Sequence, residues 1–253
     1  MIRSVYNAGM GMLALQKKQE NISNNLANLE TPAFKARTLL SEASFSALIS
    51  NQAAPGGQWT QLGAMNMGTS VSEVYTDHTQ GILLESGANL DFALEGPGFF
   101  QVDTPQGMRL TRNGRFHLSG EGYLADERNN PVLAAYPGGG SGYLYPNEGT
   151  SLAVSAAGEV VAGGETLGRL LVVEPADPGT LTDQGDGYFE AAALLDSPVT
   201  AVRQGFTEQS NVSMADQLIQ LMTNTSLLSS NQRVLSTLDE TLGRAVNELG
   251  RLG

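Results

Sequence analysis

The sequence predicts a mainly β chain of the α+β class, in which a sandwich- or barrel-like body is bracketed by two terminal helices. Three observations support this fold. Apolar residues follow heptad patterns at both ends, and short apolar segments alternate with turn-forming residues in the middle. The 253 residues also include 30 glycines, which suits a body with many tight turns. We expect the terminal helices to pair into a coiled-coil-like stem.

The N-terminal segment, residues 1–37, carries the first helix. Steps of three and four residues define a seam that is apolar at seven of eight positions: Val5, Ala8, Met12, Leu15, Gln19, Ile22, Leu26 and Leu29. Thr31-Pro32 ends the helix, because proline disfavours helical geometry in the residue before it. The segment holds all three lysines and a net charge of +3, against −15 for the remainder, which indicates a separate role.

The C-terminal segment, residues 205–253, repeats the pattern in a longer helix that Ser213 can cap. Its expected seam is Met214, Leu218, Leu221, Thr225, Leu228, Gln232, Leu235, Asp239, Leu242, Val246 and Leu249. Thr225, Gln232 and Asp239 recur every seven residues, so they either set the register of an interface or face solvent. A second apolar row indicates more than one neighbour for this helix: Ile219, Met222, Leu227, Val234 and Leu238.

The terminal helices either dock onto their own chain or form an interface with other subunits. We assign the second role to their apolar seam residues. This predicted assembly interface is Val5, Met12, Leu15, Ile22, Leu26, Leu29, Met214, Leu218, Leu221, Leu228, Leu235, Leu242, Val246 and Leu249.

The middle of the chain divides into two parts. Residues 38–70 are polar and weakly periodic, which is typical of a linker or extension. Residues 71–204 form the expected β body, with short apolar segments such as 90–94, 99–102 and 170–173. The glycine-rich run 137–142 is a flexible break or a loop tip within that body.

Composition and motifs argue against catalysis, cofactor binding and nucleic-acid binding. Cysteine is absent, and His78 and His117 lack metal-ligand spacing. Asp183, Asp186 and Glu190 lack the alternating order of a calcium loop. A carboxylate pair that meets in space stays an open alternative. A net charge of −12 opposes phosphate binding. We therefore expect no catalytic residue, no cofactor and no metal site.

Membrane insertion and a cleaved signal peptide are also not expected. No apolar run approaches 18 residues. The apolar run 8–15 is short and is followed by Gln16-Lys17-Lys18 rather than by a small-residue cleavage site.

Three stretches together resemble the rod and hook axial proteins of the bacterial flagellum. The first, residues 21–35, is an asparagine-rich helix end followed by a Thr-Pro-Ala-Phe-Lys turn; the second covers 90–116, and the third covers 204–212. The matching residues are Asn21, Asn24, Asn25, Asn28, Thr31, Pro32, Phe34, Lys35, Gly96, Gly98, Phe99, Phe100, Arg112, Asn113, Gly114, Ser210, Asn211 and Val212. Ala33 stands where this family usually has glycine, which puts a left-handed turn there in question.

The resemblance implies a structural subunit of the flagellar basal-body rod, exported by the flagellar type III apparatus without a cleaved signal. Its partners would be copies of itself, other flagellar axial proteins and the rings that act as bushings, in a tube that crosses the periplasm and cell wall. The spacing from Lys35 to Gly68 is similar to that of distal rod members. Two alternatives remain open: a proximal rod or hook-type axial protein, and a secreted β-sandwich binding module.

Overall fold

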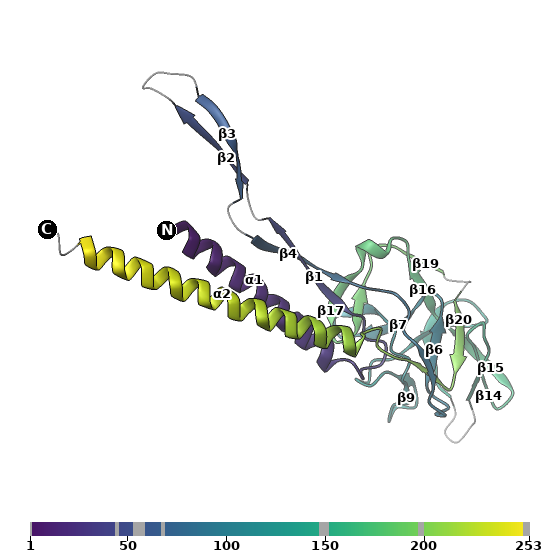
Figure 1. Cartoon of the computed structure of the whole chain (residues 1–253). Coiled ribbons are helices and arrows are strands. Elements are labelled where there is room, and N and C mark those ends of the chain that lie inside the picture. Colours follow the sequence, from purple (N-terminus) through teal and green to yellow (C-terminus); the bar gives the residue numbers. More distant parts are fainter. Residues whose placement is uncertain are drawn as a thin grey trace. The chain divides into compact units, whose positions relative to one another are not determined.

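The computed structural model describes residues 2–43, 46–52, 59–66, 69–146, 152–196 and 200–249 (Figure 1). The chain forms two compact units. Unit 1 comprises Met1–Ala27, Arg37–Asp77 and Ser213–Gly253, and unit 2 comprises Asn28–Ala36 and His78–Val212. Because the chain passes from one unit to the other more than once, each unit is assembled from segments that are distant in sequence.

Unit 1 contains the two expected terminal helices, α1 (Ile2–Ala27) and α2 (Met214–Leu249). They pack side by side and run antiparallel (Figure 1). Ser213 caps α2, since its Oγ accepts a hydrogen bond from the backbone N–H of Asp216 at 3.4 Å. Asp216 also places a negative charge in the first turn, where the helix dipole favours it.

Unit 1 also contains two antiparallel strand pairs, of which three strands lie almost wholly in the region 38–70 expected to be a linker or extension, while the fourth continues into the region expected to be the β body. β1 pairs with β4, and β2 pairs with β3. The bounds are β1 (Arg37–Ala43), β2 (Ser46–Gln52), β3 (Trp59–Asn66) and β4 (Thr69–Thr76). β-Branched residues such as Thr38, Val74 and Thr76 favour extended backbone. Both ladders contain a register shift, which interrupts the strict alternation that marks a strand in sequence.

Unit 2 contains two larger antiparallel sheets. The six-stranded sheet has the order β17-β18-β8-β7-β16-β19, and the five-stranded sheet has the order β12-β11-β15-β14-β13. The first comprises β7 (Phe99–Thr104), β8 (Gly107–Thr111), β16 (Val172–Pro175), β17 (Thr182–Gly185), β18 (Tyr188–Glu190) and β19 (Leu194–Asp196). The second comprises β11 (Leu133–Ala135), β12 (Ser141–Tyr143), β13 (Leu152–Val154), β14 (Glu159–Ala162) and β15 (Glu165–Leu170).

Smaller antiparallel pairs complete unit 2. β5 pairs with β21, β6 with β20, and β9 with β10. Their bounds are β5 (Leu83–Glu85), β6 (Phe92–Glu95), β9 (His117–Leu118), β10 (Leu124–Ala125), β20 (Ala201–Gln204) and β21 (Phe206–Glu208). A single 3-10 turn, η1 (Pro178–Thr180), lies between β16 and β17.

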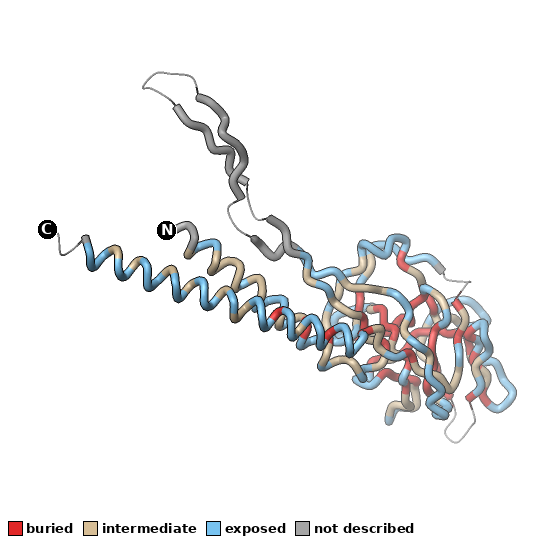
Figure 2. The backbone as a smooth tube through the Cα atoms, in the orientation of Figure 1, coloured by how far each residue is buried: buried red, intermediate tan, exposed pale blue. Residues whose placement is uncertain are grey.

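The hydrophobic core lies in unit 2, where side chains from both larger sheets meet. Phe100 and Val102 from β7 pack with Val160 and Leu170 from β14 and β15, and all four are almost fully buried. Buried residues accordingly concentrate in unit 2, whereas the helices are mostly exposed or half-buried (Figure 2). The predicted mainly β, α+β class with terminal helices is confirmed.

Candidate functional site

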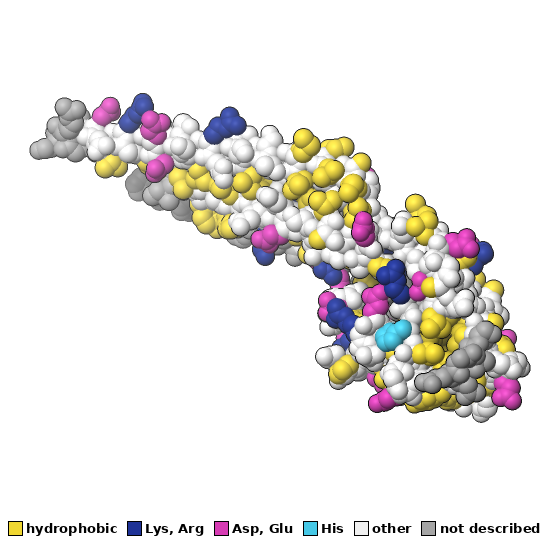
Figure 3. Space-filling view, turned by 90° about the horizontal axis from the view of Figure 1, so that it is seen from below, with side chains coloured by type: hydrophobic (Ala, Val, Ile, Leu, Met, Phe, Trp, Pro, Cys, Tyr) yellow, Lys and Arg dark blue, Asp and Glu magenta, His cyan; other side chains and the backbone are white. Residues whose placement is uncertain are grey.

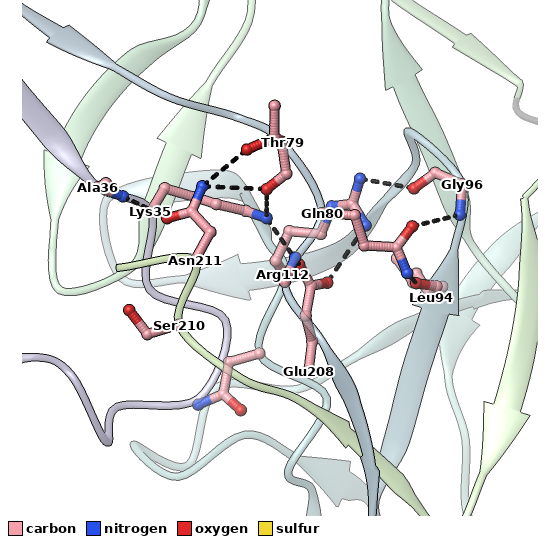
Figure 4. Close-up of polar contacts among 12 residues, drawn as sticks. Lys35, Ala36, Thr79, Gln80, Leu94, Gly96, Arg112, Glu208, Ser210 and Asn211 are labelled. Atoms are coloured by element: carbon pink, nitrogen blue, oxygen red, sulfur yellow. Dashed lines mark hydrogen bonds and ion pairs between the residues drawn. The ribbon is translucent and has the colours of Figure 1, made fainter. Parts of the chain in front are cut away.

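Three charged side chains form a buried cluster in unit 2. Lys35 Nζ lies 2.6 Å from Glu208 Oε1, and Arg112 Nη1 lies 3.3 Å from Glu208 Oε2. All three side chains are at most 2% exposed. Because an unpaired buried charge is costly, Glu208 stabilises both cations at once. We call Lys35, Arg112 and Glu208 the charge cluster (Figure 4).

Backbone groups add three hydrogen bonds to the charge cluster. Lys35 Nζ donates to the carbonyl of Thr79 at 2.7 Å, and Arg112 Nη2 donates to the carbonyl of Gly96 at 2.6 Å. The backbone N–H of Gly81 donates to Glu208 Oε1 at 2.9 Å. These bonds compensate the loss of water around the ions. Because Lys35, Arg112 and Glu208 are far apart in sequence, the cluster joins three distant stretches of chain.

Burial lowers the pKa of Arg112, and the nearby Glu208 carboxylate opposes that shift by favouring the charged guanidinium. The guanidinium also lies 5.0 Å from the centre of the Phe99 ring, which adds a cation–π contact. Arg112 Nε has no hydrogen-bond partner among the described residues. The cluster is therefore a structural ion pair network.

Side-chain amides add a second set of crosslinks around the charge cluster. Asn211 Oδ1 accepts from the backbone N–H of Ala36 at 2.7 Å, and its Nδ2 donates to Thr79 O at 3.1 Å. Gln80 Nε2 donates to Leu94 O, and Gln80 Oε1 accepts from Gly96 N–H (Figure 4). These amides replace ladder hydrogen bonds where the chain leaves regular structure.

Two motif glycines permit a close approach of backbone segments. A Cβ on Gly114 would lie 1.7 Å from the carbonyl oxygen of Phe92, and one on Gly98 would lie 2.6 Å from Val172 Cγ1. Real side chains do not tolerate such distances, so both positions require glycine for packing. Gly114 also accepts a backbone hydrogen bond from Phe92 N–H at 2.8 Å.

Ala33 adopts the left-handed conformation although it is not glycine, with a φ of 56°. Its side chain is buried, and its N–H donates to the carbonyl of Glu208 at 2.8 Å. The turn is therefore present at the position where the alanine put it in question. Tertiary contacts hold it against the local preference of an L-residue.

The antiparallel helix pair of unit 1 has its own polar contacts. Asn25 Nδ2 donates to Arg37 O at 2.8 Å while Arg37 N–H donates to Asn25 Oδ1 at 3.0 Å, so the amide pairs with the first residue of β1. Asn25 Nδ2 also lies 3.4 Å from Gln217 Oε1 on α2. Further along the pair, Asn224 Nδ2 donates to Leu15 O at 2.9 Å. Amide side chains thus line the contact between the helices.

The covered face of α2 differs from the expected seam in one of its two columns. The covered residues are Gln217, Leu221, Asn224, Leu228, Asn231, Leu235, Leu238, Leu242 and Ala245, all buried or half-buried. The other expected column is exposed: Leu218, Thr225, Gln232, Asp239 and Val246. The leucines at 221, 228, 235 and 242 form one row along α2, and a further row of residues lies on each side of it. In the structure, the row that contains Gln217, Asn224 and Asn231 is covered together with the leucines. Within this chain Thr225, Gln232 and Asp239 therefore face solvent.

The predicted assembly residues fall into two groups in the structure. Those that are buried or half-buried are Val5, Met12, Leu15, Ile22, Leu26, Leu29, Leu221, Leu228, Leu235 and Leu242. Met214, Leu218 and Val246 are exposed, and the side chain of Leu249 lies outside the described residues. Their role in assembly stays a prediction.

The remaining motif residues serve local structure. Thr31 Oγ1 donates to Asn28 Oδ1, Phe34 O accepts from Asn211 N–H, and Asn113 Oδ1 accepts from Arg115 N–H. Phe99, Phe100 and Val212 are buried, Asn21, Pro32 and Ser210 are half-buried, and Asn24 is exposed. The structure thus gathers five motif residues around the charge cluster and leaves most of the others in separate turns and core positions. The five are Lys35, Gly96, Phe99, Arg112 and Asn211.

Sequence reasoning missed Glu208, Gln80, Gln217 and Asn224. Glu208 carries no local signal, because it is 173 positions from Lys35 and because Arg112 stands between the polar residues Thr111 and Asn113. The amides carry no signal either, since Asn and Gln are common on exposed helix faces.

The described residues contain no group of three or more His, Asp or Glu side chains arranged to hold a metal ion. No described helix combines the length and hydropathy of a membrane span.

Comparisons with known proteins agree with this arrangement. Three family models match: "Flagella basal body rod protein" over residues 5–35, "Flagellar hook protein FlgE/F/G D1 domain" over 93–162, and "Flagellar basal body rod FlgEFG protein C-terminal" over 203–248. The charge cluster draws Lys35 from the first region, Arg112 from the second and Glu208 from the third.

Full-length relatives give the same result. The chain is 28% identical to the flagellar basal-body rod protein FlgG of Bacillus subtilis, with 98% of this chain and 99% of that protein aligned. It is 29% identical to the flagellar basal-body rod protein FlgF of Caulobacter vibrioides, with both chains fully covered. The flagellar hook-basal body complex protein FlhO of B. subtilis is 26% identical over the full length of both. The three matched regions together cover more than half of the chain and contain every residue of the charge cluster, so the chain belongs to the family of flagellar basal-body rod and hook proteins.

Proposed function

We propose that this chain is a structural subunit of the bacterial flagellar basal-body rod and that it assembles through its terminal helices. One observation carries the proposal. While one face of α2 packs against α1, the rest of the helix surface keeps exposed apolar residues: Met214, Leu218, Ile219, Met222, Leu227 and Val234. Figure 3 shows apolar side chains gathered along the helical part of the surface.

The pattern of exposure supports contacts with further helices. Met222 is 74% exposed and Ile219 is 62% exposed, which is unusual for several large apolar side chains on one helix. Burying each would contribute roughly 1.5–3 kcal/mol. A neighbouring subunit can supply this burial, as expected of a chain that polymerises.

The experiment compares exposed positions of one helix in a strain whose native gene is deleted and whose swimming is restored by a plasmid copy of the unmodified gene. The double variant Leu218→Asp/Met222→Asp should abolish swimming and rod assembly. Gln220→Asp, also exposed on α2, should leave both intact. Each purified variant should melt like the unmodified chain, because these side chains have few contacts within it. Normal rods from the double variant would refute assembly through this face.

The resemblance to this family supports the finer parts of the proposal. The partners are copies of this chain, other flagellar axial proteins, the type III export apparatus and the bushing rings, and the site is the basal body. Export proceeds without cleavage of a signal peptide, so mass spectrometry of the protein from purified rods should recover peptides that cover residues 4–17. A distal position is supported by the length of the chain between Lys35 and Gly68. Cross-linking in intact basal bodies, with the hook-proximal rod end as reference, tests that position.

A further inference from the structure

Four of the seven tyrosines gather on one part of unit 2. The Tyr123 ring lies 5.9 Å from the Tyr143 ring and 6.2 Å from the Tyr145 ring, measured between centroids. Tyr136 joins them because its hydroxyl donates to the carbonyl of Tyr143 at 2.6 Å. We call Tyr123, Tyr136, Tyr143 and Tyr145 the tyrosine surface. It surrounds the glycine-rich run 137–142, to which the rod assignment gives no role.

The rings of the tyrosine surface are both held and accessible. Tyr145 is 56% exposed and Tyr136 is 39% exposed. Tyr143 Oη donates to Asp103 Oδ2 at 2.7 Å, which fixes its orientation. Side chains that are fixed before binding lose little entropy on contact, and tyrosine is enriched in protein interfaces for this reason.

The glycines of the β11–β12 hairpin keep this surface open. A Cβ on Gly138, Gly139 or Gly140 would meet nothing within 4 Å, so the hairpin tip is bare and projects into solvent. At Gly142 a Cβ would lie 2.8 Å from the Tyr136 ring, so that ring rests directly on the backbone of β12. β12 is also the edge strand of the five-stranded sheet. The glycines thus shape a platform that no neighbouring side chain of the hairpin covers.

The charge of unit 2 indicates the sign of the partner. Acidic residues outnumber basic residues by 18 to 7 in unit 2, whereas unit 1 has 8 acidic and 7 basic residues. Six of the seven basic residues of unit 2 form ion pairs within that unit: Lys35, Arg109, Arg112, Arg115, Arg128 and Arg203. The Asp103 carboxylate accepts a hydrogen bond from Tyr143, and Glu121 stands two positions before Tyr123 in the sequence. The local field therefore favours a cation.

We propose that the tyrosine surface docks an arginine-bearing segment of another protein. A guanidinium can stack on the exposed rings while it pairs with the flanking carboxylates, and arginine combines both contacts better than lysine. This surface lies on unit 2, so the proposal is independent of assembly through the helices of unit 1.

The test follows the ring signals of the full-length chain labelled with 3-fluorotyrosine. The probe is the blocked peptide Gly-Arg-Ser-Arg-Gly, and its twin carries neutral citrulline at both arginines. The arginine peptide should shift the fluorine signals of the tyrosine surface and leave those of Tyr6 and Tyr75 in place. The citrulline twin should produce no saturable shift, and the affinity for the arginine peptide should fall as salt is added.

Variants locate the contact. Tyr145→Ser should weaken peptide binding about two- to fivefold, the range of one exposed cation–π contact. Tyr6→Ser, which removes an equally exposed tyrosine of α1, should change nothing. Tyr145→Leu keeps the apolar bulk and removes the ring face. It should therefore weaken peptide binding as much as serine does, even if serine disturbs the fold.

Three results would overturn the proposal. Equal binding of the citrulline twin would remove the role of charge. Equal loss from Tyr6→Ser would mean that the peptide binds elsewhere. Shifts with a chitotriose probe and none with the arginine peptide would identify a saccharide surface in its place. Rod assembly in cells should survive Tyr145→Ser, which separates failure of this proposal from failure of the rod assignment.

Discussion

At the residue scale, Glu208 contacts several residues that are distant from it in the sequence. Its two carboxylate oxygens serve two different cations, and its backbone carbonyl accepts from Ala33. Removal of the anion would leave Lys35 and Arg112 buried side by side without compensation.

We expect Glu208→Gln to lower the free energy of unfolding by about 3–5 kcal/mol, the typical loss when one partner of a buried ion pair is removed. Glu95→Gln is the matched control, because Glu95 pairs with Arg203 at an exposed site. That control should cost less than about 1 kcal/mol. Urea unfolding followed by circular dichroism measures both. Equal effects would mean that the charge cluster is not a stabilising feature.

Ala33 offers a second test at this scale. Its φ of 56° strains an L-residue by about 1–2 kcal/mol, whereas glycine costs about 0.5–1 kcal/mol in backbone entropy. We expect Ala33→Gly to be neutral or to raise the melting temperature slightly. Ala36→Gly, at a position without a positive φ, should lower it. A loss at position 33 as large as that at position 36 would show that the strain is negligible.

At the element scale, the terminal helices show where sequence patterns are informative. The heptads predicted both helices and their pairing, because apolar spacing reports directly on a buried face. They did not predict whether the row of Asn224 or the row of Thr225 faces α1, because both rows lie next to Leu221 and its heptad repeats. The decision rests on polar contacts such as Asn224 with Leu15, which periodicity does not encode.

Asn224 provides the prediction for this element. Its side chain is 2% exposed, and its Oδ1 has no partner among the described residues. Leucine would remove that unsatisfied atom, so we expect Asn224→Leu to stabilise the helix pair by about 1–3 kcal/mol. Thr225→Leu, at the adjacent exposed position, should have little effect. Melting of the 222 nm signal checks both, and destabilisation by Asn224→Leu would indicate that the amide is better satisfied than this structure shows.

At the scale of the whole molecule, the sequence predicted the order of helix, body and helix but not the closure of the body. Residues 71–204 were expected to form it, and its core does lie there. Unit 2, however, also draws on Asn28–Ala36 and on residues up to Val212. No local pattern marks Lys35 and Glu208 as partners, because they are separated by 173 positions.

Truncation tests this boundary. A fragment of residues 28–212 retains the whole charge cluster and β21, so it should fold with a cooperative melt. A fragment of residues 71–204 lacks Lys35, Glu208 and the β5–β21 pair, and it should melt well below the longer fragment or fail to fold. Proton NMR dispersion and calorimetry distinguish the two. Equal stability would show that the charge cluster lies outside the cooperative unit.

The same separation has a consequence for timing. A chain that emerges amino end first from a narrow conduit presents Lys35 to water long before Glu208 follows. Contacts between distant positions form slowly, and Lys35 has no acidic partner in the cluster until about four fifths of the chain has passed. The ammonium group of Lys35 must stay hydrated in the interval, which keeps the early part of unit 2 from closing prematurely. Completion of the fold is thereby linked to the near-complete delivery of the polypeptide.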